Sequence, residues 1–252
     1  MLKFVLGTVG ALAMAGSASA ADIAAGPSTK APMMVAMYDW SGFYIGGNGG
    51  WGSSHKCWDF TNAVGNFIVA EGCHDAAGGT AGGQVGYRWQ RSAMVFGLEA
   101  QGNWAGFKGS NVSIPFPVVV NETRLDAFGL FTAQVGYSWN NALLYLKGGA
   151  ALTADRYRGY TTATGIQVSD VVKDTRWGGA IGAGVEYGFT PNWSAAIEYD
   201  HLFMQDRLIG FTNNGVLAPA GTLRAYDRIH QDVDLVTVRV NYRWGGPVVA
   251  RY

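Results

Sequence analysis

The segment Glu-Tyr-Asp-His at 198–201 has the residue types of a catalytic or metal-binding cluster. A histidine beside carboxylates can transfer protons, and both kinds of side chain can ligate a metal ion. The surrounding residues alternate as in a β-strand, so Glu198 and Asp200 face one side and His201 the other. We therefore expect no catalytic residue and no metal ligand here.

A second candidate, Gly-Asn-Gly-Gly-Trp-Gly at 47–52, matches the dinucleotide-binding pattern G-x-G-x-x-G. That fingerprint needs a strand before the glycines and a helix after them. Strand alternation runs through this segment and no helical pattern follows it. Tight packing explains the glycines better, and the sequence predicts no cofactor.

Covalent chemistry is expected of the two cysteines, Cys57 and Cys73. Neither belongs to a CxxC or Cys/His set with zinc spacing. In an exported chain the expectation for such a pair is a disulfide, here with 15 residues between the partners. His55, His74 and His230 fall in predicted loops, where haem or metal binding is a weaker alternative.

The start of the chain predicts export. Lys3 precedes a short apolar run, and Ala18 to Ala20 form a small-residue cleavage site, so we expect a signal peptide at 1–20. A short periplasmic segment at 21–37 and a barrel domain at 38–252 follow. Loss of Lys3 leaves 17 basic and 18 acidic residues of the original 18 and 18, a balance that excludes nucleic acid as the main partner.

An aromatic pentapeptide, Val-x-Tyr-x-Trp or Val-x-Tyr-x-Phe, occurs four times. Three copies are followed by a short turn and a second alternating run, the pattern of a β-hairpin. Long segments separate the hairpins, and an even number of strands with alternately short and long connections is typical of an outer-membrane barrel. The copies lie at 85–89, 135–139, 185–189 and 240–244.

We therefore predict an all-β fold, an eight-stranded antiparallel transmembrane β-barrel. It has short periplasmic turns and four long extracellular loops, at about 54–78, 106–123, 157–175 and 204–232. Phe128 and Leu130 break the alternation of the fourth strand, because they fall on its polar face. The expected strands are 42–53, 79–90, 94–105, 124–139, 143–156, 176–189, 193–203 and 233–244.

Alternation alone does not say which face is outside, since a lipocalin buries its apolar face. Gly, Ala and Ser crowd the polar face here, and eight strands leave an interior just wide enough for side chains. Val, Ile and Leu occupy the middle of the other face and aromatics one end, as at a bilayer interface. The expected periplasmic girdle is Tyr87, Trp89, Tyr137, Trp139, Tyr187, Phe189, Tyr242 and Trp244.

The inward face carries four basic and four acidic side chains. Isolated charges would be very costly in a narrow lumen, whereas a balanced set can pair. We expect these pairs to close the lumen to large solutes, with Arg239 bridging carboxylates that the sequence alone does not identify. The expected network is Arg88, Lys147, Arg239 and Arg243 with Glu99, Glu186, Glu198 and Asp200.

Three stretches carry a family resemblance: YDWSGFYIGGNGGWG at 38–52, VEYGFTPNWSAAIEYDHL at 185–202 and VTVRVNYRW at 236–244. They resemble the small porin-family outer-membrane proteins of alphaproteobacteria, which are similar in plan to the OmpA transmembrane domain. The resemblance implies residence in a Gram-negative outer membrane, contact with lipid and lipopolysaccharide, and delivery by the barrel-assembly machinery. That machinery reads a terminal aromatic, which is here either Trp244 or Tyr252.

These observations give two hypotheses for function. The first is a passive barrel with a structural role in the envelope and at most a narrow porin-like pore. The alternative is a surface-binding or adhesion protein that acts through its extracellular loops on an unidentified ligand. Some small outer-membrane barrels deacylate lipid with a serine and a histidine near the lipid face, but no such motif surrounds His201, and we expect no enzyme.

Overall fold

The computed structural model describes residues 38–216 and 218–244. The predicted signal peptide at 1–20, the segment 21–37 and the terminal Tyr252 lie outside the described residues. No helix within the described part is long and apolar enough to cross a membrane.

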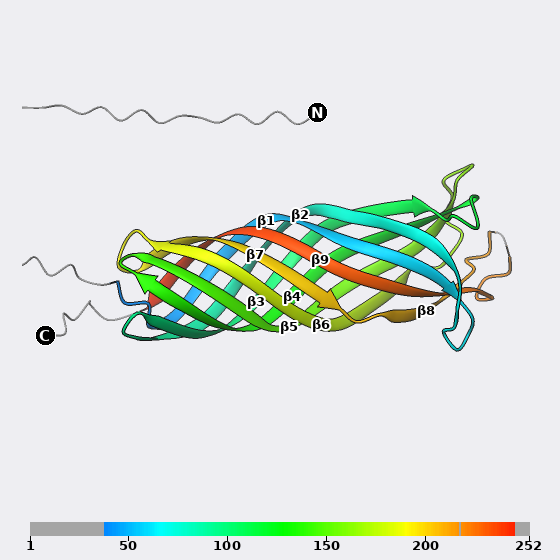
Figure 1. Ribbon diagram of the computed structural model, residues 1–252. Coiled ribbons are helices and arrows are strands. Elements are labelled where there is room, and N and C mark those ends of the chain that lie inside the picture. The colour runs from blue at the N-terminus through cyan, green and yellow to red at the C-terminus, as the bar shows by residue number, and fades with distance from the viewer. Residues whose placement is uncertain (1–37, 217, 245–252) are drawn as a thin grey trace, which may run out of the picture. The chain divides into compact units, whose positions relative to one another are not determined.

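Antiparallel strands form one closed sheet (Figure 1). From β1 to β7 each strand pairs with its neighbour in sequence, β7 then pairs with β9, and β9 pairs with β1 to complete a ring of eight. The short β8 follows β7 and pairs with the outer part of β9. Closure satisfies the backbone hydrogen-bonding groups of every strand in the ring, as a membrane requires. The strands are β1 (Gly42–Thr61), β2 (Phe67–Arg91), β3 (Met94–Val112), β4 (Val119–Trp139), β5 (Ala142–Thr161), β6 (Val172–Gly188), β7 (Trp193–Met204), β8 (Arg207–Thr212) and β9 (Leu223–Trp244).

The strands continue well into the segments predicted to be loops. The expected loop 54–78 is mostly paired, because β1 and β2 stay together as far as Thr61 and Phe67. Backbone groups outside the membrane also gain from a partner, so the ladder need not end at the bilayer. The described residues between the strands at this end are 62–66, 113–118, 162–171, 205–206 and 213–222 without residue 217.

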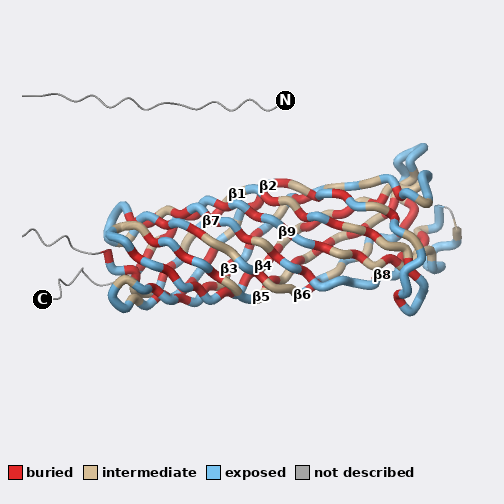
Figure 2. The backbone as a smooth tube through the Cα atoms, viewed as in Figure 1, coloured by how far each residue is buried: buried red, intermediate tan, exposed pale blue. Residues whose placement is uncertain are grey.

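Buried and exposed residues alternate along the strands (Figure 2). Register shifts interrupt the pairing at five places in the outer half of the described chain, among them those between Trp58 and Asp59, between Trp104 and Phe107, and between Leu125 and Ala127. Such bulges change which side chains face inward. They explain why simple alternation predicts the strands' inner halves better than their outer extensions.

The inward side chains of β9 pass through successive layers of the interior. From the short-turn end they include Arg239 in a lower ion network, Leu235 and Val233 in an apolar plug, Gln231 in an upper ion cluster, and Asp227 at the outer mouth. The lumen therefore changes character along its length. It is filled by charged groups, then hydrocarbon, then charged groups again.

Phe128 and Leu130, which break the expected alternation of β4, belong to the apolar plug. Both are buried inside the barrel. Their inward position is therefore the normal alternation of β4, and the lumen at this level is itself apolar. The plug consists of Ala76, Phe107, Leu125, Phe128, Leu130, Ala151, Ala180, Leu202, Met204, Val233 and Leu235.

Candidate functional site: the barrel interior and its outer mouth

Arg239 is the centre of the lower ion network. Its guanidinium donates to Glu99 at 2.5 Å and also to Glu198, so one cation on β9 joins carboxylates from β3 and β7. Tyr44 donates to Glu99 at 2.6 Å and Tyr145 donates to Glu198 at 2.7 Å. A planar guanidinium can bridge two carboxylates in this way because it carries several fixed donors.

Lys147 and Arg88 bind the other lower carboxylates. The Lys147 ammonium lies 2.6 Å from Glu198, 3.1 Å from Asp200 and 3.9 Å from Glu99. Arg88 lies 2.8 Å from Glu186, whose carboxylate also accepts from neighbouring side chains. Every predicted lumen acid therefore lies within reach of a cation.

Arg243 is the one predicted member that does not join the network. It donates to the backbone oxygens of Ser41 and Pro191, each at 2.7 Å, and lies 5.2 Å from the centre of the Tyr38 ring. The cause is its position at the short-turn end, where exposed carbonyl groups are nearer than the acids. The expected pairing of four cations with four carboxylates is thus wrong for Arg243.

The outer surface carries two rows of aromatic residues. The predicted girdle residues lie on the outer face near the short turns, and Trp193 packs against Tyr242 with ring centres 5.1 Å apart. A second row, which the sequence analysis missed, is formed by Trp51, Trp104, Trp177 and Phe203, all exposed.

The two rows are ten residues apart along a strand, as Trp177 and Tyr187 show on β6 and Trp193 and Phe203 on β7. A membrane-spanning β-strand has about 9–11 residues. We infer that the rows bracket the apolar band, and that β1 continues above the band from Trp51 to Thr61. The sequence analysis missed the upper row because its residues follow no repeated motif. Their ten-residue spacing from the lower row was the signal that could have identified them.

An upper ion cluster lies inside this extension. Lys56 donates to Asp155 at 2.5 Å and to Gln231 at 2.9 Å, and Arg176 donates to the Tyr157 hydroxyl at 2.6 Å. Burial lowers the pKa of Lys56 to about 8, against the opposing effect of Asp155. The sequence analysis missed these residues because it placed three of them, Lys56, Tyr157 and Gln231, in loops. It placed Asp155 and Arg176 at the ends of strands.

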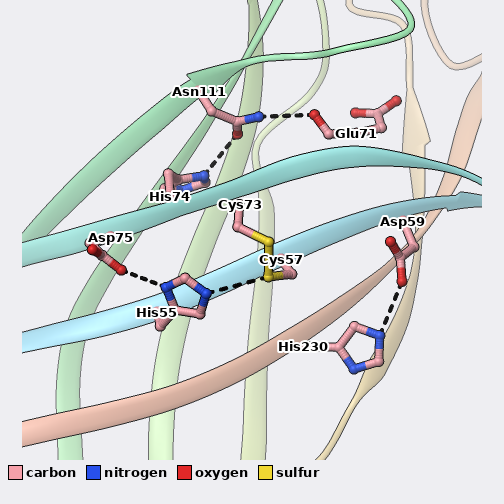
Figure 3. Close-up of a disulfide and its surroundings, with 9 residues drawn as sticks. All are labelled: His55, Cys57, Asp59, Glu71, Cys73, His74, Asp75, Asn111 and His230. Carbon is pink, nitrogen blue, oxygen red and sulfur yellow. Dashed lines mark hydrogen bonds and ion pairs between the residues drawn. A yellow bond between two sulfur atoms is a disulfide. The ribbon is translucent and has the colours of Figure 1, made fainter.

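Cys57 and Cys73 form the predicted disulfide (Figure 3). The two residues are register partners of β1 and β2 with Cα atoms 4.1 Å apart, so the bridge links paired strands rather than closing a free loop. His55 stands next to the bridge and pairs with Asp75 at 2.6 Å. The oxidised sulfurs offer no thiolate to a metal ion at this cluster.

The other two histidines predicted in loops, His74 and His230, lie instead on the extended strands β2 and β9, as His55 lies on β1, and they are also occupied by hydrogen bonds. His74 contacts Asn111 at 2.8 Å, and His230 contacts Asp59 at 3.2 Å, as Figure 3 shows. A second carboxylate, Asp206, lies 2.8 Å from His230. The weaker alternative of haem or metal binding gains no convergent histidine pair from this arrangement.

His201 lies on the outer face and contacts Asp234 at 2.7 Å. Asp234 is the register partner of His201 on one side and of Ser53 on the other. A serine nucleophile needs the histidine next to it and the carboxylate behind the histidine. Here the carboxylate stands in the middle, so this row does not have the geometry of a hydrolase triad.

A cavity of about 240 Å³ opens at the outer mouth. Its walls include stacked Trp58 and Phe211, with ring centres 5.4 Å apart, and Phe60 and Phe116 in an edge contact at 5.6 Å. These residues come from β1, β8 and the 113–118 connection. The cavity therefore exists because the strands extend above the membrane.

Three charged side chains line the cavity: Glu71, Arg224 and Asp227. Glu71 accepts from Asn121 at 2.5 Å. The Asp227 Oδ1 and Arg224 Nη1 atoms are buried and have no hydrogen-bond partner among the described residues. Burial raises the pKa of Asp227 to about 8, and the charge of Glu71 adds to the rise.

The chain is similar to outer-membrane proteins of known sequence. It is 28% identical over 229 residues to the 31 kDa outer-membrane immunogenic protein of Brucella melitensis, which spans 86% of this chain and 93% of that protein.

Solved structures show the same fold at low identity. OprG of Pseudomonas aeruginosa matches with a TM-score of 0.52 and 11% identity, over 83% of this chain and 99% of that one. The protease OmpT of Escherichia coli matches with a TM-score of 0.51 and 12% identity, over 81% and 97%. Likeness at this identity concerns the fold and not the chemistry.

The protein-family model for the outer membrane protein beta-barrel domain matches residues 8–245, nearly the whole chain. Together with the closed ring of strands and the two aromatic rows, this match shows that the chain belongs to the outer-membrane β-barrel family and resides in the outer membrane.

Proposed function

We propose that the protein is a closed structural barrel of the cell envelope, which holds a paired β-sheet above the membrane surface. The observation that carries this proposal is the filling of the lumen. Arg239 and Lys147 bind three carboxylates across the lower interior, and hydrocarbon side chains fill the layer above them. Eight strands leave too little room for a wide channel beside such side chains.

Two ion clusters separated by hydrocarbon oppose the passage of solutes. A water or ion that entered between Lys147 and Asp200 would next meet buried groups such as Leu130 and Leu235. Hydrocarbon contacts offer no partner to a polar solute, and its desolvation is costly. This arrangement supports at most a narrow and rarely open path.

An enzyme role has no support from the outer-face residues. His201 is held by Asp234, and Ser53 lies on the far side of that carboxylate.

We propose lipid, lipopolysaccharide and the assembly machinery as partners because the exposed apolar band must meet the membrane. A second candidate function, binding at the cell surface, is favoured by the cavity between Trp58 and Asp227.

The test is conductance of the refolded protein in a planar lipid bilayer. We expect small and infrequent openings and no flux of sugars into vesicles. A general porin in the same bilayer shows that open channels would be detected. Steady, large conductance with sugar flux would refute the closed barrel.

A further inference from the structure

The cavity at the outer mouth has the features of a ligand site rather than a packing defect. Its charged side chains come from two strands, Glu71 from β2 and both Arg224 and Asp227 from β9. Buried polar atoms in proteins are normally paired, and an unpaired one calls for an explanation. Asp200 also has oxygens without a hydrogen bond, but a cation lies beside it, whereas Asp227 forms no ion pair among the described residues. A bound molecule that supplies the missing partner is an explanation for Asp227.

The charged side chains at the cavity indicate the sign of the charge on that bound molecule. Glu71 and Asp227 outnumber Arg224, so the fully ionised lining carries one excess negative charge. The remaining lining from β1, β4, β5 and β8 contributes uncharged groups, including Trp58, Asn121, Gly159 and Phe211, so nothing there offsets the excess. A monovalent cation would neutralise the site.

The aromatic walls and the volume of the cavity indicate the chemical type and the size of the bound molecule. Trp58, Phe60, Phe116 and Phe211 offer ring faces and edges, which attract both aromatic rings and cations. A cavity of 150 Å³ holds one benzene ring and drug-sized sites begin near 300 Å³. The observed 240 Å³ therefore fits one ring with a short chain.

We infer that the outer mouth binds a small aromatic amine, with its ammonium group between Glu71 and Asp227 and its ring against the aromatic walls. This site goes beyond the structural role proposed above. It stands above the plug, so a closed lumen and an occupied mouth are compatible.

Binding should depend on pH through Asp227. Its raised pKa means that the empty site holds this carboxyl mostly protonated at pH 7, and pairing with an ammonium favours the ionised form. Binding then releases a proton. The apparent affinity rises about tenfold per unit from pH 6 toward pH 8 and levels off above it.

The experiment is calorimetric titration of the full mature protein, refolded in detergent, with phenethylamine between pH 6 and pH 9. The size-matched alcohol 2-phenylethanol and the anion 3-phenylpropanoate are titrated in parallel, and gel mobility before and after heating checks each variant for folding. We expect the alcohol to bind at least tenfold more weakly and the anion more weakly still. Equal binding of amine and alcohol, preference for the anion, or no binding would each overturn the inference.

Two variants identify the groups responsible. Asp227→Asn should weaken phenethylamine binding tenfold or more and reduce the pH dependence. Glu71→Gln should weaken binding and move the pH dependence to lower pH, because the Glu71 charge contributes to the raised pKa of Asp227. Asp232→Asn, which changes an exposed carboxylate on the same strand, is the matched control and should change neither. Unchanged affinity in both folded site variants would exclude the proposed position of the amine.

Discussion

The lower interior and the outer mouth bury charged side chains to a similar degree but differ in how those charges are paired. Arg239 is 1% exposed and binds two carboxylates, whereas Asp227 is 3% exposed and forms no ion pair among the described residues. Asp200 in the lower network also has oxygens without a hydrogen bond, but its carboxylate lies 3.1 Å from Lys147. Burial alone therefore does not separate a structural group from a binding group. Ion pairing does, and on our proposals the paired charges of the lower region serve stability while the unpaired carboxyl of Asp227 serves binding.

The largest expected effect comes from Arg239→Ala. The change leaves Glu99 and Glu198 with Lys147 as their remaining cation, and breaking a buried pair costs about 3–5 kcal/mol. We expect a lower free energy of unfolding in urea and a higher, noisier conductance. Arg243→Ala is the control because its guanidinium binds no carboxylate and contacts backbone oxygens and the Tyr38 ring instead, and equal stability of the two variants would contradict the network.

The next effect tests where the membrane band ends. Val238 and Leu223 both lie on the outer face of β9 and are each 56% exposed, but Leu223 is above the band. Val238→Arg should cost about 2–4 kcal/mol in lipid vesicles because the charge meets the bilayer interior, while Leu223→Arg should cost almost nothing. Similar losses of folding yield for both variants would mean that the band is misplaced.

Removal of the disulfide should affect the upper region alone. Closing a loop of this length is worth about 3 kcal/mol on the chain-entropy model, and the bridge lies between strands above the band. In the double variant Cys57→Ser, Cys73→Ser we expect faster amide hydrogen exchange in the β1–β2 extension. The heat-dependent gel mobility of the barrel should stay as in the parent, and its loss would show that the two regions unfold together.

The smallest effect compares the two aromatic rows. Trp139 in the lower row is 75% exposed and Trp104 in the upper row is 78% exposed. Each change to Ala should cost less than about 2 kcal/mol, since an interface side chain is only partly removed from water. Equal losses in vesicles would support two interfaces, and no loss for Trp104 would place its row outside the membrane.

The sequence predicted the membrane-embedded half of the fold because alternation is strict there. The short turns, the parity of Val238 and the inward acids all follow from a period of two. The carboxylate partners of Arg239 could not be predicted from this alternation, because they depend on the stagger between β9, β7 and β3. A one-residue change of register would have given it different neighbours.

The outer half resisted prediction for two physical reasons. Bulges such as that between Trp104 and Phe107 shift the parity, and the outward face above the membrane is no longer uniformly apolar, as the exposed pair His55 and Asp75 shows. The segment containing Lys56 and Cys57 was therefore assigned to a loop. The cavity around Asp227 is formed by several strands that are far apart in sequence, and no local sequence motif predicts it.

Arg239 also imposes an order in time. It lies in β9, the final strand, while Glu99 and Glu198 lie in β3 and β7, so both acids are synthesised before the cation that joins them. Until β9 pairs with β1 along the seam from Phe43 and Trp244 to Thr61 and Tyr226, the growing interior lacks that cation. We expect a chain stalled before β9 to remain uninserted and open to periplasmic proteases, which pulse-labelling of truncated chains would reveal.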